Sequence, residues 1–345
     1  MKAGVLQKVD QLVLADVAKP MITEDDILVR VHAAAFCGTD IRIIRGMKTK
    51  GIRYPSIIGH EFSGDIVEVG KNVTSFQKGN RVTVDPVLPC GGCAYCLNGL
   101  ENVCLNRKAI GYEFDGCFAE YILIPGDFIN SGNVQLLPDV VSYEEGALAE
   151  PLSCVINGQR KLNITLGETI LIIGAGPIGI MHLMIARASG GAKIIVSEPN
   201  EFRRNAAKEM GADLVIDPIH ENLVEIVKDQ TNTLGADVVI LAIGNPRVVN
   251  DALNCARKGG RISMFAGFSK GDMPGVDVNV IHYNELVVVG ASSLQRRDLK
   301  TAINLIASGS VHVKQLITKV FPLDQIAEAF DLAESGGAIK VVVKP

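Results

Sequence analysis

Apolar runs of strand length alternate with helical stretches through the second half of the chain, from about residue 153. The run Thr169–Ile173 precedes a helical pattern that extends to about Ser189, and Lys193–Ser197 precedes another over about 201–210. Further strands are expected at Leu214–Ile216, Val238–Ala242, Arg261–Phe265 and Leu286–Val289. Regular alternation of strand and helix predicts βαβ units, and therefore an α/β fold with a parallel sheet covered on both faces.

The first 150 residues follow a different pattern, in which short apolar runs are separated by Gly and Pro. These runs are Ile27–Ala35, Gly64–Val69, Arg81–Val84 and Phe118–Ile124. Strands broken in this way predict an irregular β domain. After about residue 290, the pattern predicts helices over Asp298–Ser308 and Leu323–Glu334 and a strand over Lys340–Val343. This tail is too short to fold alone, so we expect it to return to the first domain.

One apolar stretch, Ile170–Ala188, approaches the length of a membrane span. It contains three glycines, Pro177 and His182, and its pattern is that of a strand, a turn and a helix. We therefore expect a buried strand and helix, and no membrane segment.

The composition is that of a globular protein of 345 residues with a net charge of −4. Its basic residues are scattered, so we expect neither a nucleic acid nor an anionic membrane as partner. The N-terminal residues contain no uninterrupted apolar segment and no cleavage-like site, which argues against a secretory signal. We accordingly expect a cytoplasmic protein in which the eight cysteines stay reduced.

Half of the cysteines form one motif, C-x2-C-x2-C-x7-C, made by Cys90, Cys93, Cys96 and Cys104. Two-residue loops allow thiolates to converge on one tetrahedral ion, which favours zinc. An iron–sulfur site is the rival, but the C-x3-C-P ending of bacterial ferredoxins is absent. Four unrelated buried thiols are the simplest alternative. Since four protein ligands leave no position for water, we expect a structural site.

A second group of potential ligands is spread over the first domain. His60 and Glu61 follow the apolar segment Ser56–Ile58, the motif Cys37-Gly38-Thr39-Asp40 lies upstream, and Glu150 lies downstream. A catalytic zinc needs three protein ligands and one open position. A lone His-Glu pair is weak support for such a site, but here it shares a chain with the cysteine motif and a nucleotide motif.

The nucleotide motif is a glycine-rich loop in which Gly174, Gly176 and Gly179 fit G-x-G-x-x-G between a predicted strand and a predicted helix. Such a loop lets a pyrophosphate approach the helix N-terminus. Glu198 lies where an acidic residue binds the adenosine ribose, which favours NAD over NADP. Arg203 and Arg204 lie close by and could admit a 2′-phosphate. The alternative is a glycine-rich turn without nucleotide.

Taken in order, these motifs resemble the zinc-containing medium-chain dehydrogenase/reductase superfamily, with the sorbitol (polyol) and L-threonine dehydrogenase branches most similar. The resemblance covers essentially the whole chain. It implies a GroES-like β-rich catalytic domain (residues 1–152 and 291–345) and an inserted, doubly wound Rossmann domain (153–290). It also implies an active site in the cleft between them and a homotetramer or homodimer.

The resemblance also implies roles for individual residues. Thr39 matches the hydroxyl that contacts the substrate oxygen, and Glu150 matches the acid beside the zinc or its water. The expected catalytic zinc ligands are Cys37, His60 and Glu61, and the structural ones are Cys90, Cys93, Cys96 and Cys104. The expected nucleotide contacts are Gly174, Gly176, Ile178, Gly179, Glu198 and Arg203.

One position departs from the family. Many relatives have a His five residues after the catalytic Cys as part of a proton relay, whereas this chain has Arg42. An Arg stays protonated and cannot relay a proton in the same way. Either water carries the proton out, or Arg42 binds an anionic part of the substrate or cofactor. The alternative is an Arg that is merely exposed at the edge of the cleft. Arg296 and Arg297, at the start of a predicted helix, either join Arg42 as substrate contacts or are solvated.

The sequence therefore predicts a dehydrogenase with two zincs and NAD that oxidises a secondary alcohol: a polyol, sugar acid, polyol phosphate or hydroxy amino acid. The alternatives are L-threonine 3-dehydrogenase specifically, and a zinc- and nucleotide-binding protein without turnover. A zinc-free reductase of the same superfamily fits poorly, because such chains usually lack both zinc motifs.

Overall fold

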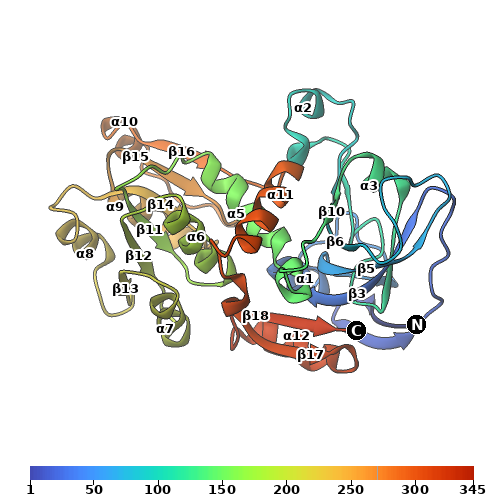
Figure 1. Ribbon diagram of the computed structural model, residues 1–345. Helices are drawn as coiled ribbons and strands as arrows, with labels where there is room; N and C mark the ends of the chain where they lie inside the picture. Colours follow the sequence, from blue (N-terminus) through green and yellow to red (C-terminus); the bar gives the residue numbers. More distant parts are fainter. Residues whose placement is uncertain (270) are drawn as a thin grey trace. The chain divides into compact units, whose positions relative to one another are not determined.

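The computed structural model describes residues 1–269 and 271–345. It divides into two compact units (Figure 1). Unit 1 comprises Met1–Ser153 and Leu294–Pro345, and unit 2 comprises Cys154–Ser293. No helix in the described part of the chain is long and apolar enough to cross a membrane. The apolar stretch Ile170–Ala188 divides into a strand and a 12-residue helix.

Unit 2 is built on a six-stranded sheet in the order β13-β12-β11-β14-β15-β16, with every neighbouring pair parallel. The order runs outward from β11 in both directions, which is the doubly wound topology. The strands are β11 (Thr169–Ile173), β12 (Lys193–Ser197), β13 (Leu214–Ile216), β14 (Ala236–Leu241), β15 (Ala256–Met264) and β16 (Val287–Gly290). The predicted α/β fold class is thereby confirmed.

The helices of unit 2 follow its strands in the expected alternation. They are α6 (Pro177–Ala188), α7 (Glu201–Glu209), α8 (Leu223–Asp229), α9 (Val249–Cys255) and α10 (Val278–Tyr283). Leu171, Ile195, Val239 and Ile262, on four central strands, are fully buried. Strands covered on both faces need such continuous apolar runs, which is why the sequence pattern identified them.

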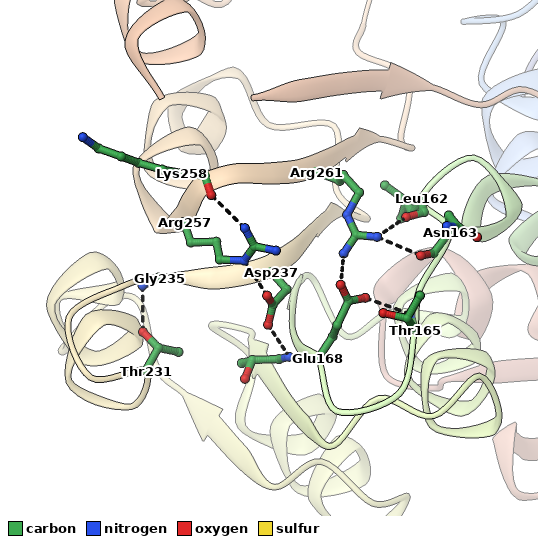
Figure 2. A network of polar contacts seen from close by, with 11 residues as sticks. Leu162, Asn163, Thr165, Glu168, Thr231, Gly235, Asp237, Arg257, Lys258 and Arg261 are labelled. Carbon is green, nitrogen blue, oxygen red and sulfur yellow. Dashed lines mark hydrogen bonds and ion pairs between the residues drawn. The ribbon is translucent and has the colours of Figure 1, made fainter. Parts of the chain in front are cut away.

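A polar network in unit 2 joins β11, β14 and β15 to the loop before β11 (Figure 2). Arg261 on β15 donates to the carbonyls of Leu162 and Asn163, each at 2.7 Å, and pairs with Glu168. On β14, Asp237 accepts from the Thr169 backbone amide at 2.8 Å and from Arg257 at 2.5 Å. These contacts satisfy loop carbonyls that would otherwise lack partners.

Unit 1 is β-rich and contains short helices. Its main sheet has the order β10-β6-β5-β3-β18-β17, and β9 also pairs with β3. The strands are β3 (Ile27–Ala35), β5 (Glu61–Val69), β6 (Arg81–Val84), β9 (Tyr121–Ile124), β10 (Val134–Leu136), β17 (Ile317–Pro322) and β18 (Lys340–Lys344). A second sheet contains β1 (Lys2–Lys8), β2 (Gln11–Asp16) and β4 (Ser56–Ile57), and β7 (Val87–Leu88) pairs with β8 (Lys108–Ala109).

The N-terminal and C-terminal segments of unit 1 meet in its main sheet. β18 pairs antiparallel with β3, with Val342 opposite Ala35, so the C-terminal segment completes this sheet. The main helices of unit 1 are α1 (Gly38–Ile44), α11 (Arg296–Ala307) and α12 (Ile326–Ser335), and α5 (Ala149–Arg160) begins in it. Phe62, Phe118 and Phe128 are among the large side chains buried in its core.

Candidate functional site

Strand register brings the first group of predicted ligands together in unit 1. Cys37 lies just after β3 and Glu61 begins β5, and the two strands pair with Ala35 opposite Glu61. His60 immediately precedes β5, so it lies at the same end of the sheet. One ligand atom from each of Cys37, His60 and Glu61 lies within 4.8 Å of the others. The structure thus joins segments more than twenty residues apart into one potential ligand set.

Asp40 orients this set from α1. Its Oδ2 accepts the Cys37 backbone amide at 2.9 Å, and its Oδ1 lies 3.3 Å from His60 Nδ1. Since Nδ1 faces Asp40, the other ring nitrogen is the one available to a metal; ligating histidines commonly have such a carboxylate partner. Burial lowers the pKa of His60, but Asp40 and Cys37 raise it well above its ordinary value. Asp40 is a functional residue that the motifs did not reveal, although its position three residues after Cys37 is a usable signal.

Lys340 on β18 is the second residue that the motifs did not reveal. Its ammonium lies 2.5 Å from Glu61 Oε2, and both residues are buried. Burial raises the pKa of Glu61, although Lys340 and His60 lower it. Only the pairing of β18 with β3 brings this cation from the end of the chain to Glu61. No local sequence pattern could have linked the two residues.

The chemistry of this ligand set fits a zinc ion. Both carboxylate oxygens of Glu61 are buried and, among the described residues, have no hydrogen bond of normal geometry. Buried polar atoms are rarely left in that state unless a ligand satisfies them. A thiolate, an imidazole and a carboxylate are the three ligand types that catalytic zinc sites combine, with a fourth position left open.

Thr39 and Glu150 lie in the same unit as this set. The Thr39 backbone amide donates to Cys37 Sγ at 3.4 Å, which places the half-buried Thr39 directly beside the thiol. Glu150, in the first turn of α5, is 6% exposed, and its charge raises the pKa of Lys340. Both residues are therefore close to the ligand set, and their catalytic roles stay predictions.

The four-cysteine motif forms a second cluster in unit 1. The Sγ of Cys93 lies 3.5 Å from that of Cys96 and 3.8 Å from that of Cys104, and one ligand atom of each of the four cysteines lies within 4.8 Å of the others. Tetrahedral zinc with Zn–S distances of about 2.3 Å places its sulfurs roughly 3.8 Å apart. The amides of Cys96 and Leu105 lower the pKa of Cys93 to about 6, which favours the thiolate. The geometry fits a closed, structural zinc.

The three arginines predicted as anion contacts have different surroundings. Arg42 is exposed on the last turn of α1. Its charge adds to burial in lowering the pKa of Lys48. Arg296, at the start of α11, donates to the Ser131 carbonyl and lies 3.5 Å from the Glu101 carboxylate. Arg297 is exposed on the same helix. Arg296 already has an anionic partner, and substrate contact by Arg296 or Arg297 stays a prediction.

The glycine-rich loop in unit 2 runs from the end of β11 to the start of α6. Gly174 has a φ of 102°, which favours glycine, and a Cβ on Gly179 would lie 1.9 Å from the Gly174 carbonyl oxygen. Gly176 caps α6 beside open space, and half-buried Ile178 lies in the first turn of that helix. This strand–turn–helix is the arrangement that a dinucleotide pyrophosphate requires.

Glu198 follows β12 and lies against the same loop. Its Oε2 accepts the Ala175 backbone amide at 2.7 Å, and its Oε1 accepts the Asn200 amide at 3.0 Å. Each oxygen keeps a lone pair for a further donor. Arg204 is occupied by Asp217 at 3.0 Å and by backbone carbonyls, whereas the Nε of Arg203 is buried without a partner among the described residues. Arg203 is thus the arginine with free donor capacity near Glu198.

Comparisons with known proteins match the chain along its length. Residues 23–133 match the alcohol dehydrogenase GroES-like domain, and residues 177–308 match the zinc-binding dehydrogenase family. D-arabitol-phosphate dehydrogenase of Enterococcus avium is 36% identical and covers 97% of this chain and 94% of that protein. Sorbitol dehydrogenase of Bacillus subtilis is 34% identical, with coverage of 100% and 97%. A zinc-binding dehydrogenase structure from Sinorhizobium meliloti, bound to NADP, has a TM-score of 0.93 and 32% identity and covers 100% of this chain and 99% of that one.

Proposed function

Because this chain belongs to the zinc-containing medium-chain dehydrogenase family, we propose that it oxidises a secondary alcohol of the polyol class with NAD. The observation that carries the proposal is the convergence of Cys37, His60 and Glu61, in which the buried carboxylate of Glu61 has no hydrogen bond of normal geometry among the described residues. Similarity to D-arabitol-phosphate and sorbitol dehydrogenases favours a polyhydroxylated substrate.

In the proposed mechanism, Cys37, His60 and Glu61 hold a catalytic zinc, and Asp40 fixes the orientation of the histidine. Zinc bound there would supply Lewis acidity to a substrate hydroxyl and lower its pKa. Thr39 accepts a hydrogen bond from that hydroxyl and passes the hydroxyl proton toward solvent. The carboxylate of Glu150 contributes negative charge beside the zinc ligands. Arg42 stays protonated and does not relay the proton, so water completes the path.

We propose that unit 2 binds the nucleotide and that NAD is preferred. Gly174, Gly176 and Gly179 admit the pyrophosphate, and the remaining lone pairs of Glu198 accept the adenosine ribose hydroxyls. A carboxylate at this position repels a 2′-phosphate. The rival is NADP, which the Sinorhizobium meliloti structure contains and whose phosphate Arg203 could bind.

The edge of the unit 2 sheet supports the proposed homodimer or homotetramer. β16 is an edge strand, and its Val287 and Val288 are 51% and 37% exposed. An apolar edge strand tends to pair with another chain.

The free cysteines of both proposed zinc sites form no disulfide, which favours a reducing compartment such as the cytoplasm.

An alcohol screen tests the proposed function. NAD and NADP reduction is measured with polyols, polyol phosphates, sugar acids and threonine. Glu198→Ala is expected to raise the KM for NAD by about 10- to 100-fold and to reduce the preference for NAD over NADP, because the ribose loses hydrogen bonds to a charged acceptor. Glu201→Ala, an exposed change on α7, is the matched control. No reduction with any alcohol would contradict the proposed function, and an unchanged KM for NAD in Glu198→Ala would contradict the ribose assignment.

A further inference from the structure

Three basic side chains of unit 1 influence one another beside the proposed catalytic site. Burial lowers the pKa of Lys48, and the charges of Arg107 and Arg42 lower it further, while those of Cys37 and Asp40 raise it. Backbone contacts place the three residues in adjoining segments. The Lys48 amide donates to the Arg42 carbonyl at 3.1 Å. Arg107 directly precedes β8, whose Ala109 carbonyl accepts the Tyr112 amide at 3.2 Å. We call Lys48, Arg42 and Arg107 the cationic cluster.

Tyr112 connects this cluster to the proposed zinc ligands. The Lys48 ammonium donates to the Tyr112 hydroxyl at 3.1 Å and lies 4.7 Å from the centre of its ring. The Tyr112 ring centre is in turn 6.1 Å from that of His60. Lys48 is thus separated from a proposed ligand by a single aromatic side chain. Because the Tyr112 hydroxyl accepts from Lys48, it keeps its own hydrogen as a donor for a bound molecule.

The cationic cluster has hydrogen-bond donors that no protein acceptor uses. An ammonium carries three N–H groups and a guanidinium five. Lys48 uses one on Tyr112, and Arg107 uses one on the Asn102 carbonyl. Within residues 1–269 and 271–345, none of the three cations forms an ion pair with a carboxylate. Lys48 is half-buried, whereas Arg42 and Arg107 are exposed. A half-buried positive charge without a paired anion is costly, so a bound anion would relieve that cost at Lys48.

We infer that Lys48, Arg42 and Arg107 bind the phosphate of a phosphorylated polyol whose secondary alcohol is oxidised at the Cys37 site. This inference rests on the proposed function and narrows its substrate class. A phosphate monoester carries about −1.5 to −2 charges at pH 7 and offers three acceptor oxygens, which three cations match better than a single carboxylate charge. Of these three residues, Arg42 was predicted from the sequence as an anion contact, whereas no motif identified Lys48 or Arg107.

The first experiment compares kcat/KM for a pentitol phosphate, the same pentitol and the matching pentonate, in the zinc-loaded full-length protein. We expect the pentitol phosphate to be strongly preferred. In Lys48→Met, the ratio of kcat/KM for the phosphorylated to the unphosphorylated pentitol falls about 10- to 100-fold, because one charge-assisted contact is lost. Lys48→Arg retains most of the ratio, since it keeps the charge.

Two exposed lysines in the same segments provide matched controls. Lys50→Met and Lys108→Met remove the same charge and leave the ratio unchanged. Equal turnover of the phosphorylated and unphosphorylated pentitol, a preference for the pentonate, or an unaltered ratio in Lys48→Met would overturn the inference. A raised KM for NAD with an unaltered ratio would instead assign the cations to the nucleotide.

A binding measurement separates this inference from the proposed function. We expect inorganic phosphate to bind the wild-type protein in calorimetry and to bind Lys48→Met at least about tenfold more weakly. If no alcohol is oxidised but phosphate still binds through Lys48, the proposed function fails and the anion site stands. If polyols are oxidised but Lys48→Met binds phosphate like the wild type, only the anion site fails.

Discussion

Buried charges around Glu61 link the final strand of the chain to the proposed chemistry. Glu61 and Lys340 are both almost fully buried, and each has the other as its ion-pair partner. A buried pair adds little stability by itself, but loss of one partner is strongly destabilising because the other charge stays buried. Zinc bound to Glu61 would take over part of this compensation.

Lys340→Met is therefore expected to lower the free energy of unfolding of the metal-free protein by about 3–5 kcal/mol. With zinc bound, the loss is expected to be smaller, because the metal neutralises the carboxylate. Denaturant unfolding with and without zinc measures both values. Lys344→Met is the control: it removes a half-exposed lysine of the same strand that pairs with Glu144, and should cost at most about 1 kcal/mol. An equal loss with and without zinc would contradict a metal at Glu61.

Residues in short motifs could be proposed from the sequence, whereas their supporting residues could not. Cys37, His60 and Glu61 belong to recognisable local patterns, and the strand register explains why they converge. Lys340, Lys48 and Arg107 reach the site through β18 and two loops, so their positions depend on tertiary structure. Asp40 is intermediate, because its spacing from Cys37 was visible but its contact with His60 was not.

At the scale of elements, apolar periodicity located most strands of unit 2, and polar residues account for the late predicted start of β15. β15 begins at Ala256, earlier than the predicted Arg261, because the polar residues Arg257 to Gly260 continue the strand after an irregularity in its pairing with β14. Their Lys-Gly-Gly composition is typical of a turn, which is why the sequence pattern placed the start too late. Arg257 and Arg261 on this strand supply the network of Figure 2.

We expect the polar network of Figure 2 to stabilise unit 2. Arg261→Met removes the donors to the carbonyls of Leu162 and Asn163 and the partner of Glu168. We expect the free energy of unfolding to fall by about 2–4 kcal/mol, since polar groups are left unpaired in a partly buried place. Denaturant unfolding measures this free energy, and hydrogen exchange of the β11 amides measures the local loss of stability. Lys258→Met, an exposed change on the same strand, should have little effect, and an equal effect of both changes would refute the network's role.

At the scale of the whole molecule, the sequence allowed the α/β class to be predicted, because a strand–helix alternation follows a region of short, interrupted strands. The pairing of β18 with β3 was expected only as a return of the tail, since periodicity carries no information about which strand is the partner. The two groups of potential metal ligands both lie in unit 1, and the glycine-rich loop lies in unit 2. Metal and nucleotide binding should accordingly be separable by mutation.

The most direct test of the central claim is to measure zinc content, NADH binding and polyol-dependent NAD reduction in the wild-type protein and in Cys37→Ser, with Cys154→Ser as control. We expect two zincs per wild-type chain and one in Cys37→Ser, with NADH binding unchanged and turnover reduced by more than about 1,000-fold. Cys154→Ser, which alters a cysteine outside both clusters, should keep both zincs. A Cys37→Ser protein that retained wild-type zinc content or wild-type turnover would show that Cys37 does not hold a catalytic zinc.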